Sequence, residues 1–231
     1  MIRCRISKRE LLKKMVAVLR VQTEPTLHFS KEGLKIVETD YSHVIMIYTT
    51  IPARDWEVYE VEDRDFAMDV ELFTNILRKM DDKDVELKIE KASITINDKI
   101  RIKEIEKDKK MLKIPNIEYD FKFNVKKGKF RELIDTSEFI TEDIVFVVKD
   151  GKVYATCESD NIQMNEFIAD VEYLTQIKKG RGLYAIDYLR NMVINGVNWE
   201  ITVLFGDDKP IKIEYPDEDT CYILAPKIPE G

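Results

Sequence analysis

A short motif, Ser30-Lys31-Glu32-Gly33-Leu34-Lys35-Ile36, returns later in the chain as Val148-Lys149-Asp150-Gly151-Lys152-Val153-Tyr154. Each copy is typical of two β-strands joined by a tight turn of a lysine, an acid and a glycine. The two glycines lie 118 residues apart. A motif that recurs at such a long spacing indicates an internal duplication.

Further pairs of features share this spacing. Ala67-Met68-Asp69 precedes one helical pattern and Ala185-Ile186-Asp187 precedes another, with each aspartate at the place of a helix N-cap. The same spacing aligns Leu12, Met15 and Val16 with Phe130, Leu133 and Ile134, and Val85 and Leu87 with Val203 and Phe205. The sequence therefore predicts two similar halves, each made of a strand, a helix, hairpin strands, a helix and closing strands.

The N-terminal segment carries a concentrated positive charge. Apolar residues at positions 11, 12, 15, 16 and 19 predict an amphipathic helix over residues 7–20, and Arg9, Lys13 and Arg20 share another face of it. From Arg3 to Arg20 there are seven basic residues and one acid, whereas the whole chain has a net charge of −7. Such a helix can face a polyanion. An ordinary solvated helix face is the alternative.

Composition and motifs limit the class of protein. The chain has 231 residues and is 44% hydrophobic, enough for one large or two small domains. Without a long apolar run or a signal-like N-terminus, we expect a soluble intracellular protein. Cys4, Cys157 and Cys221 are typical of buried, reduced thiols. With only His28 and His43 and no recognisable catalytic motif, we expect no enzymatic activity, no cofactor and no metal.

A connector separates the two halves. Residues 103–119 begin highly charged and then carry apolar residues without helical spacing, which predicts an extended segment. Such apolar residues are usually covered, here either by their own domain or by a partner protein. We expect a first domain over residues 1–103, a connector over 104–118 and a second domain over 119–231.

Four stretches carry a family resemblance: LKIVETDYSHV at residues 34–44, IPNIEY at 114–119, KPIKIEY at 209–215 and YILAPKI at 222–228. In these stretches, and in order along nearly the whole chain, the protein resembles the proliferating cell nuclear antigen family of archaeal and eukaryotic sliding clamps. The archaeal type is the nearer match. The last of these stretches is the most specific.

The resemblance implies an α+β fold, the DNA clamp fold, with two similar domains per chain and helices on one face of antiparallel sheets. Three chains would close head to tail into a trimeric ring around duplex DNA, with the helices lining the hole. The joint would pair a strand near Lys99–Glu106 with one near Asn161–Ala169 of the next subunit. The interface residues would be Ile100, Ile102, Ile162 and Met164.

The resemblance also implies two functional surfaces. The DNA-facing residues would be Arg5, Lys8, Arg9, Lys13, Lys14, Arg20, Arg78, Lys129, Arg131, Lys178, Lys179 and Arg181. A pocket for short peptide motifs of DNA polymerase, clamp loader, ligase and nuclease would be lined by His43, Val44, Met46, Leu112, Ile114, Pro115, Pro210, Tyr222, Ala225 and Pro226.

The implied function is that of a processivity factor in DNA replication and repair, in the cytoplasm and associated with the nucleoid if the source is prokaryotic. One alternative is a subunit of a heterotrimeric or checkpoint-type clamp that forms a ring only with sister chains. Another is an enzyme or a plain binding domain that uses the same fold.

Overall fold

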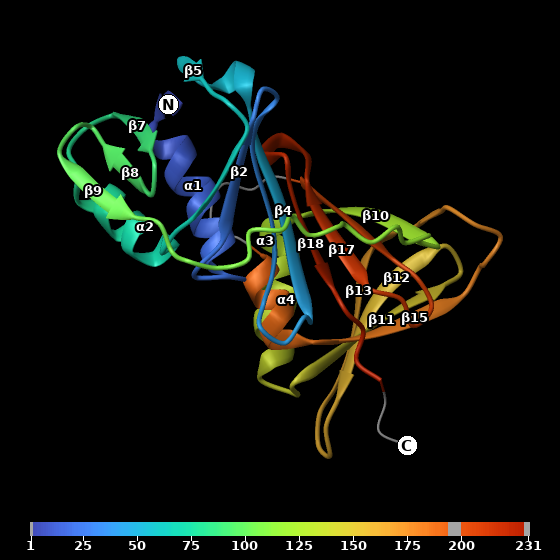
Figure 1. Cartoon of the computed structure of the whole chain (residues 1–231). Coiled ribbons are helices and arrows are strands. Elements are labelled where there is room, and N and C mark those ends of the chain that lie inside the picture. Colours follow the sequence, from blue (N-terminus) through green and yellow to red (C-terminus); the bar gives the residue numbers. More distant parts are fainter. Residues whose placement is uncertain (1, 194–199, 229–231) are drawn as a thin grey trace. The chain divides into compact units, whose positions relative to one another are not determined.

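The computed structural model describes residues 2–193 and 200–228. The chain divides into two compact units, Met1–Ile114 and Pro115–Gly231. The first unit runs from blue to green in Figure 1, and the second from green to red. The division falls inside the segment expected to be the connector.

The first unit contains two antiparallel sheets and two helices. In one sheet the strand order is β5-β1-β7-β8-β9, and in the other the strands β4, β3, β2 and β6 pair in that order. The elements are β1 (Ile2–Ser7), α1 (Lys8–Leu19), β2 (Thr26–Ser30), β3 (Gly33–Thr39), β4 (Ile45–Pro52), the 3-10 helix η1 (Ala53–Asp55), β5 (Val58–Glu60), β6 (Arg64–Ala67), α2 (Val70–Lys79), β7 (Asp84–Glu90), β8 (Ser93–Ile96) and β9 (Ile100–Lys103).

The second unit repeats this plan. Its strands pair in the orders β14-β10-β16-β17-β18 and β13-β12-β11-β15. The elements are β10 (Phe121–Lys126), α3 (Lys127–Glu138), β11 (Asp143–Lys149), β12 (Lys152–Glu158), β13 (Gln163–Asp170), β14 (Glu172–Tyr173), β15 (Gly180–Ala185), α4 (Ile186–Met192), β16 (Glu200–Phe205), β17 (Ile211–Tyr215), the 3-10 helix η2 (Pro216–Glu218) and β18 (Thr220–Leu224). The predicted duplication is confirmed strand by strand.

The constant spacing of 118 residues is wrong in detail. α1 and α3 begin 119 residues apart, at Lys8 and Lys127, whereas α2 and α4 begin 116 apart, at Val70 and Ile186. Strand register and burial determine the equivalent positions, and loops absorb the difference in length. One consequence is that Lys14, which is 8% exposed, occupies the helix position filled by buried Leu133 in the second unit.

The two expected N-caps have different outcomes. Asp69 caps α2, because its side chain accepts a hydrogen bond of 2.8 Å from the Leu72 N–H, as predicted. Asp187 is not a cap, because α4 already begins at Ile186, the residue before it, and Ala185 occupies the N-cap position. The Ile186 N–H donates to the Glu142 carbonyl at 2.9 Å, which fixes the chain where this helix starts.

Each unit has its own core between sheet and helices. In the first unit, Ile2, Cys4 and Ile6 alternate along β1 and are buried, and α1 buries Leu11 and Met15. The core of the second unit is aromatic. Its rings lie with centroids 5.2 to 6.5 Å apart: Phe121, Phe123, Phe130, Phe146 and Phe205. Tilted and edge-on ring pairs at these distances are favourable beyond the apolar area that they bury.

The segment between β9 and β10, residues 104–120, contains neither helix nor strand, as the sequence predicts. Its beginning is fastened to the first unit, since the Ile105 N–H donates to the Ala67 carbonyl at 2.9 Å. Further along, Met111, Leu112 and Ile114 are each at least 36% exposed.

Candidate nucleic-acid interface and assembly surfaces

In the first unit, several of the expected DNA-facing bases lie on the two helices. α1 turns its buried residues toward the sheet, while Arg9 is exposed and Lys13 half-buried on its other sides. Arg20 is the C-cap residue of α1. Arg78 lies exposed in the last turn of α2, where Arg78 Nη1 donates to Asn75 Oδ1 at 3.3 Å. α1 packs against α2, so this helical layer carries an excess of positive charge.

Arg5 does not belong to this layer. It alternates along β1 with buried Cys4 and Ile6, so it lies on the sheet face turned away from the helices. There its guanidinium is 3.2 Å from a Glu57 oxygen and 3.1 Å from an Asp84 oxygen. Lys8, the first residue of α1, donates from Nζ to the Met80 carbonyl at 2.5 Å. The structure therefore groups Arg9, Lys13, Arg20 and Arg78 and leaves Arg5 outside the group.

The helices of the second unit carry balanced charge. Arg131 lies 3.3 Å from Asp135, and Arg190 lies 3.9 Å from Asp135 and 2.7 Å from Glu138. Lys129 Nζ donates to the backbone carbonyls of Phe167 and Ile168 at 3.2 and 3.1 Å. Lys129, Arg131 and Arg190 are thus engaged by acceptors of the same unit.

A third group of expected bases lies away from the helices of the second unit. Lys178 and Lys179 lie just before β15 and Arg181 is its second residue, whereas α4 follows the other end of that strand. Lys178 Nζ lies 4.2 Å above the Tyr173 ring, and the Arg181 N–H donates to Asp207 at 2.8 Å. The sequence alone could not separate the bases on the helices from those near β15, because their separation depends on the strand topology.

The two strands expected at a subunit joint are both sheet edges. β9 is the last strand of its sheet beside β8, and β13 is the last strand of its sheet beside β12. An edge strand presents unpaired backbone groups to another chain. Among the expected interface residues, Ile162 just before β13 is 53% exposed and Met164 half-buried, whereas Ile102 is 6% exposed and Ile100 half-buried.

The residues expected to line the peptide pocket come from both units. In the first, His43 is exposed in the turn between β3 and β4, Val44 and Met46 are half-buried, and Leu112 and Ile114 are exposed on the connector. In the second, Pro115 is exposed, Pro210, Ala225 and Pro226 are half-buried, and Tyr222 is fully buried against Tyr215.

Burial explains the raised pKa values of the cysteines and of several tyrosines. All three cysteines are buried and unbridged, as expected, and burial raises the pKa of Cys4 to about 12 and of Cys221 to about 11. Burial likewise raises the pKa of Tyr119 and Tyr184. Within residues 2–193 and 200–228, no cluster of His, Cys, Asp or Glu could hold a metal ion. The helices described there are all too short or too polar to cross a membrane.

Comparison with known proteins identifies the family of this chain. Residues 1–123 match the family model described as proliferating cell nuclear antigen, N-terminal domain. The chain belongs to the proliferating cell nuclear antigen family. It is 25% identical over 248 aligned positions, covering 99% of both chains, to the DNA polymerase sliding clamp of Methanococcus maripaludis strain C6.

Two solved structures of the family share the fold of this chain. One is Archaeoglobus fulgidus PCNA with the C-terminal region of FEN-1 bound, at a TM-score of 0.86 and 21% identity with both chains fully covered. The other is the PCNA2–PCNA3 complex of Sulfolobus tokodaii, at a TM-score of 0.80 and 22% identity, covering 97% of this chain and 99% of that one. The α+β clamp fold is therefore confirmed.

Proposed function

We propose that this chain is a DNA sliding clamp, which encircles duplex DNA and tethers polymerase and other replication and repair proteins. The observation that carries the proposal is the repeated unit with its edge strands β9 and β13. A unit of this kind can be extended head to tail by further copies until a rotation closes the ring. The sliding clamp of M. maripaludis, similar along its whole length, supports the same function.

The direct contacts to DNA would be electrostatic. Arg9, Lys13, Arg20 and Arg78 are the bases that we assign first to phosphate contacts, because they share the helical layer of the first unit. Lysine and arginine contacts to phosphates do not read base sequence and weaken steeply with salt. Individually weak contacts would let a closed ring slide, while its topology would prevent escape. The role is one of tethering rather than catalysis.

A threading experiment tests encirclement. A linear duplex is fixed at one end, the labelled protein is added at low salt, and the free end is then either blocked or left open. A ring should stay on the blocked duplex after a high-salt wash and slide off the open one. Equal loss from both duplexes would contradict encirclement.

The number of chains in the ring is a separate question. A homotrimer should have a native mass of about 82 kDa, three times the 27.2 kDa of one chain. The similarity to the PCNA2–PCNA3 complex favours a second candidate, a subunit that closes a ring only with sister chains. Light scattering over a concentration series separates them, since the second candidate predicts about 27 kDa for the isolated chain at every concentration.

Partner proteins would dock through short peptides, as the FEN-1 C-terminal region does on A. fulgidus PCNA. On the first unit we assign this docking to the turn around His43 and to the connector around Leu112 and Ile114, which exposes apolar side chains. A peptide with the FEN-1 C-terminal sequence should bind the wild-type protein. It should bind the double variant Leu112→Asp, Ile114→Asp at least about tenfold more weakly. Unchanged affinity would exclude the connector as part of the docking surface.

A further inference from the structure

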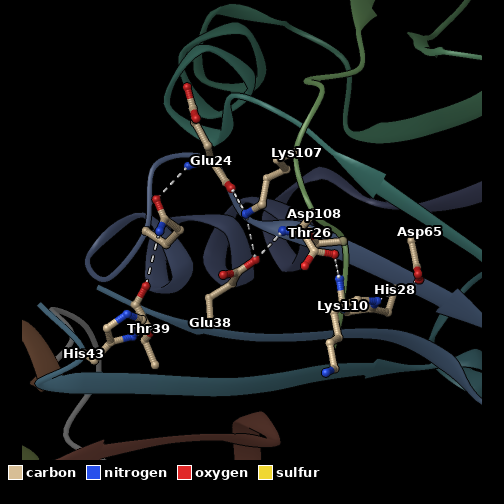
Figure 2. Close-up of polar contacts among 11 residues, drawn as sticks. Glu24, Thr26, His28, Glu38, Thr39, His43, Asp65, Lys107, Asp108 and Lys110 are labelled. Carbon is tan, nitrogen blue, oxygen red and sulfur yellow. Dashed lines mark hydrogen bonds and ion pairs between the residues drawn. The ribbon is translucent and has the colours of Figure 1, made fainter. Parts of the chain in front are cut away.

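Beyond the Ile105 hydrogen bond, a lysine of the connector also anchors it to the first unit. Figure 2 shows Lys107 reaching from the connector to the end of β3, where its Nζ lies 3.4 Å from Glu38 Oε1 and donates to the Glu24 carbonyl at 2.6 Å. The same Glu38 oxygen accepts the Thr26 N–H at 2.5 Å, and Glu38 is 8% exposed. A buried carboxylate with two donors is a rigid anchor, because losing either donor leaves a buried charge poorly paired.

From this anchor a chain of hydrogen bonds leads to the turn around His43. The Glu24 N–H donates to Gln22 Oε1 at 3.2 Å, and Gln22 Nε2 donates to the Thr39 carbonyl at 3.2 Å. Thr39 Oγ1 lies 3.0 Å from His43 Nδ1. Gln22 is 8% exposed and uses both ends of its amide, so it bridges Glu24 and Thr39. Figure 2 labels Lys107, Glu24, Thr39 and His43 along this path.

The turn at the far end of this path is itself well defined. Asp40 Oδ1 accepts the N–H groups of Val44 and Ile45 at 2.8 and 3.0 Å, and the His43 N–H donates to the Asp40 carbonyl at 3.1 Å. His43 has a positive φ of 56°. A non-glycine residue in this region is held by its surroundings, so the position of His43 depends on Thr39 and Asp40.

We propose that Gln22 is a positioning residue that couples the connector to the His43 turn, the two parts of the first unit to which we assign peptide docking. The inference rests on that proposed function for its consequence, but the coupling is a property of the chain alone. Lys107 holds the connector four residues before Met111, the first of its exposed large apolar residues. A peptide that needs both parts in place then meets them already ordered, and less conformational entropy is lost on binding.

Hydrogen exchange without any peptide tests the coupling. Lys107→Met removes the anchor while keeping the aliphatic stem, and the amides to follow are those of His43 and Val44, far along the path. Their exchange should accelerate about fivefold, as expected for one lost hydrogen bond. Lys107→Arg should restore protection. Lys113→Met, a substitution at an exposed connector lysine, is the matched control and should change neither amide.

Substitutions of Gln22, the central residue of the path, give a second test of the coupling. Gln22→Glu keeps an acceptor for the Glu24 N–H but loses the donor to the Thr39 carbonyl, and Gln22→Met loses both. Either variant should accelerate exchange of the Ile105 amide on the connector as well as that of His43. If Lys107→Met changes only the connector and the Gln22 variants change only their immediate neighbours, the coupling does not exist. Thermal unfolding of each variant establishes that it is folded.

Peptide affinity then shows whether the coupling serves docking. With the FEN-1 C-terminal peptide as probe, Lys107→Met and Gln22→Glu should each weaken binding about fivefold. The double variant should bind no more weakly than the single variant with the lower affinity, because both substitutions break the same path. Additive losses, or wild-type affinity in either single variant, would overturn the positioning role. If the wild-type protein does not bind the peptide at all, the docking function fails, while the exchange experiment still decides the coupling.

Discussion

Lys209 Nζ lies 2.8 Å from Asp120 Oδ2 at the start of β10, and Asp120 is 1% exposed. The other Asp120 oxygen accepts the Thr175 hydroxyl at 3.1 Å, and the Asp207 N–H donates to Oδ2 at 3.3 Å. Lys209 also donates to the Glu118 carbonyl at 2.8 Å. This buried carboxylate ties together three segments of the second unit just beyond the connector.

Lys209→Met should therefore lower the free energy of unfolding by about 3 kcal/mol, because it leaves the Asp120 charge buried without its cation. Urea unfolding followed by circular dichroism measures the loss. Lys122→Met is the control: the Lys122–Glu172 pair, 2.9 Å long, is exposed, and its removal should cost less than about 1 kcal/mol. Similar losses in both variants would mean that burial of Asp120 adds nothing.

The two aspartates at the second helices form a natural pair for testing helix capping. Asp69→Ala should destabilise the protein by about 1 kcal/mol, because the Leu72 N–H loses its acceptor. Asp187→Ala should have less than half this effect, since Asp187 lies inside the first turn of α4. Equal midpoint shifts in thermal unfolding would show that Asp187 caps its helix in solution after all.

DNA binding should depend on whether a base lies in the helical layer or on the opposite face of the sheet. Lys13→Gln should weaken DNA binding and reduce the salt dependence by about one contact per chain. Arg5→Gln should leave both unchanged, because Arg5 pairs with Glu57 and Asp84 on the face away from the helices. Fluorescence anisotropy over a salt series measures both quantities. An equal effect of the two substitutions would return Arg5 to the DNA surface.

Assembly should depend on the β13 edge. Ile162→Asp places a charge on an exposed apolar residue beside that edge and should lower the native mass of a homotrimer toward 27.2 kDa. Ile177→Asp is the matched control, because Ile177 is similarly exposed, at 43%, but lies between β14 and β15 rather than next to β13. Light scattering should give the wild-type mass for the control. A trimer that persists in Ile162→Asp would move the joint elsewhere.

The buried thiols should be inert in the folded protein. Burial raises the pKa of Cys4 to about 12 and of Cys221 to about 11, so few thiolates exist at pH 8. Alkylation should be slow until urea unfolds the chain. Unfolded thiols lose their protons near pH 9 while the folded ones keep them, so these groups should make the free energy of unfolding fall as pH rises above about 9. Rapid labelling at pH 8 without urea would contradict the burial.

Some features could be predicted because they depend on local pattern. The α1 stripe and the Asp69 cap follow from the spacing of apolar residues and one side-chain hydrogen bond. The spacing of the duplication was predicted only approximately, because matching Gly33 to Gly151 compares residue types. In the structure Gly33 begins β3 and is equivalent to Lys152, which begins β12. Matching residue types between the two halves can be off by one position. Strand register cannot shift by one residue, because the shift would move every side chain of the strand to the other face of the sheet.

The sequence alone determined the duplicated α+β plan, the basic N-terminal helix, the extended connector and the family. These are recorded in periodicity, turn residues and contiguous motifs. Only the tertiary structure decided that Arg5 faces away from the helices, that Lys14 fills a core position and that Arg131 and Arg190 of the second unit are paired with carboxylates. It also brought Gln22, Thr39 and Lys107 into one hydrogen-bonded path. Such relationships join residues far apart along the chain, and they exist only once the strands are in register and the helices are packed.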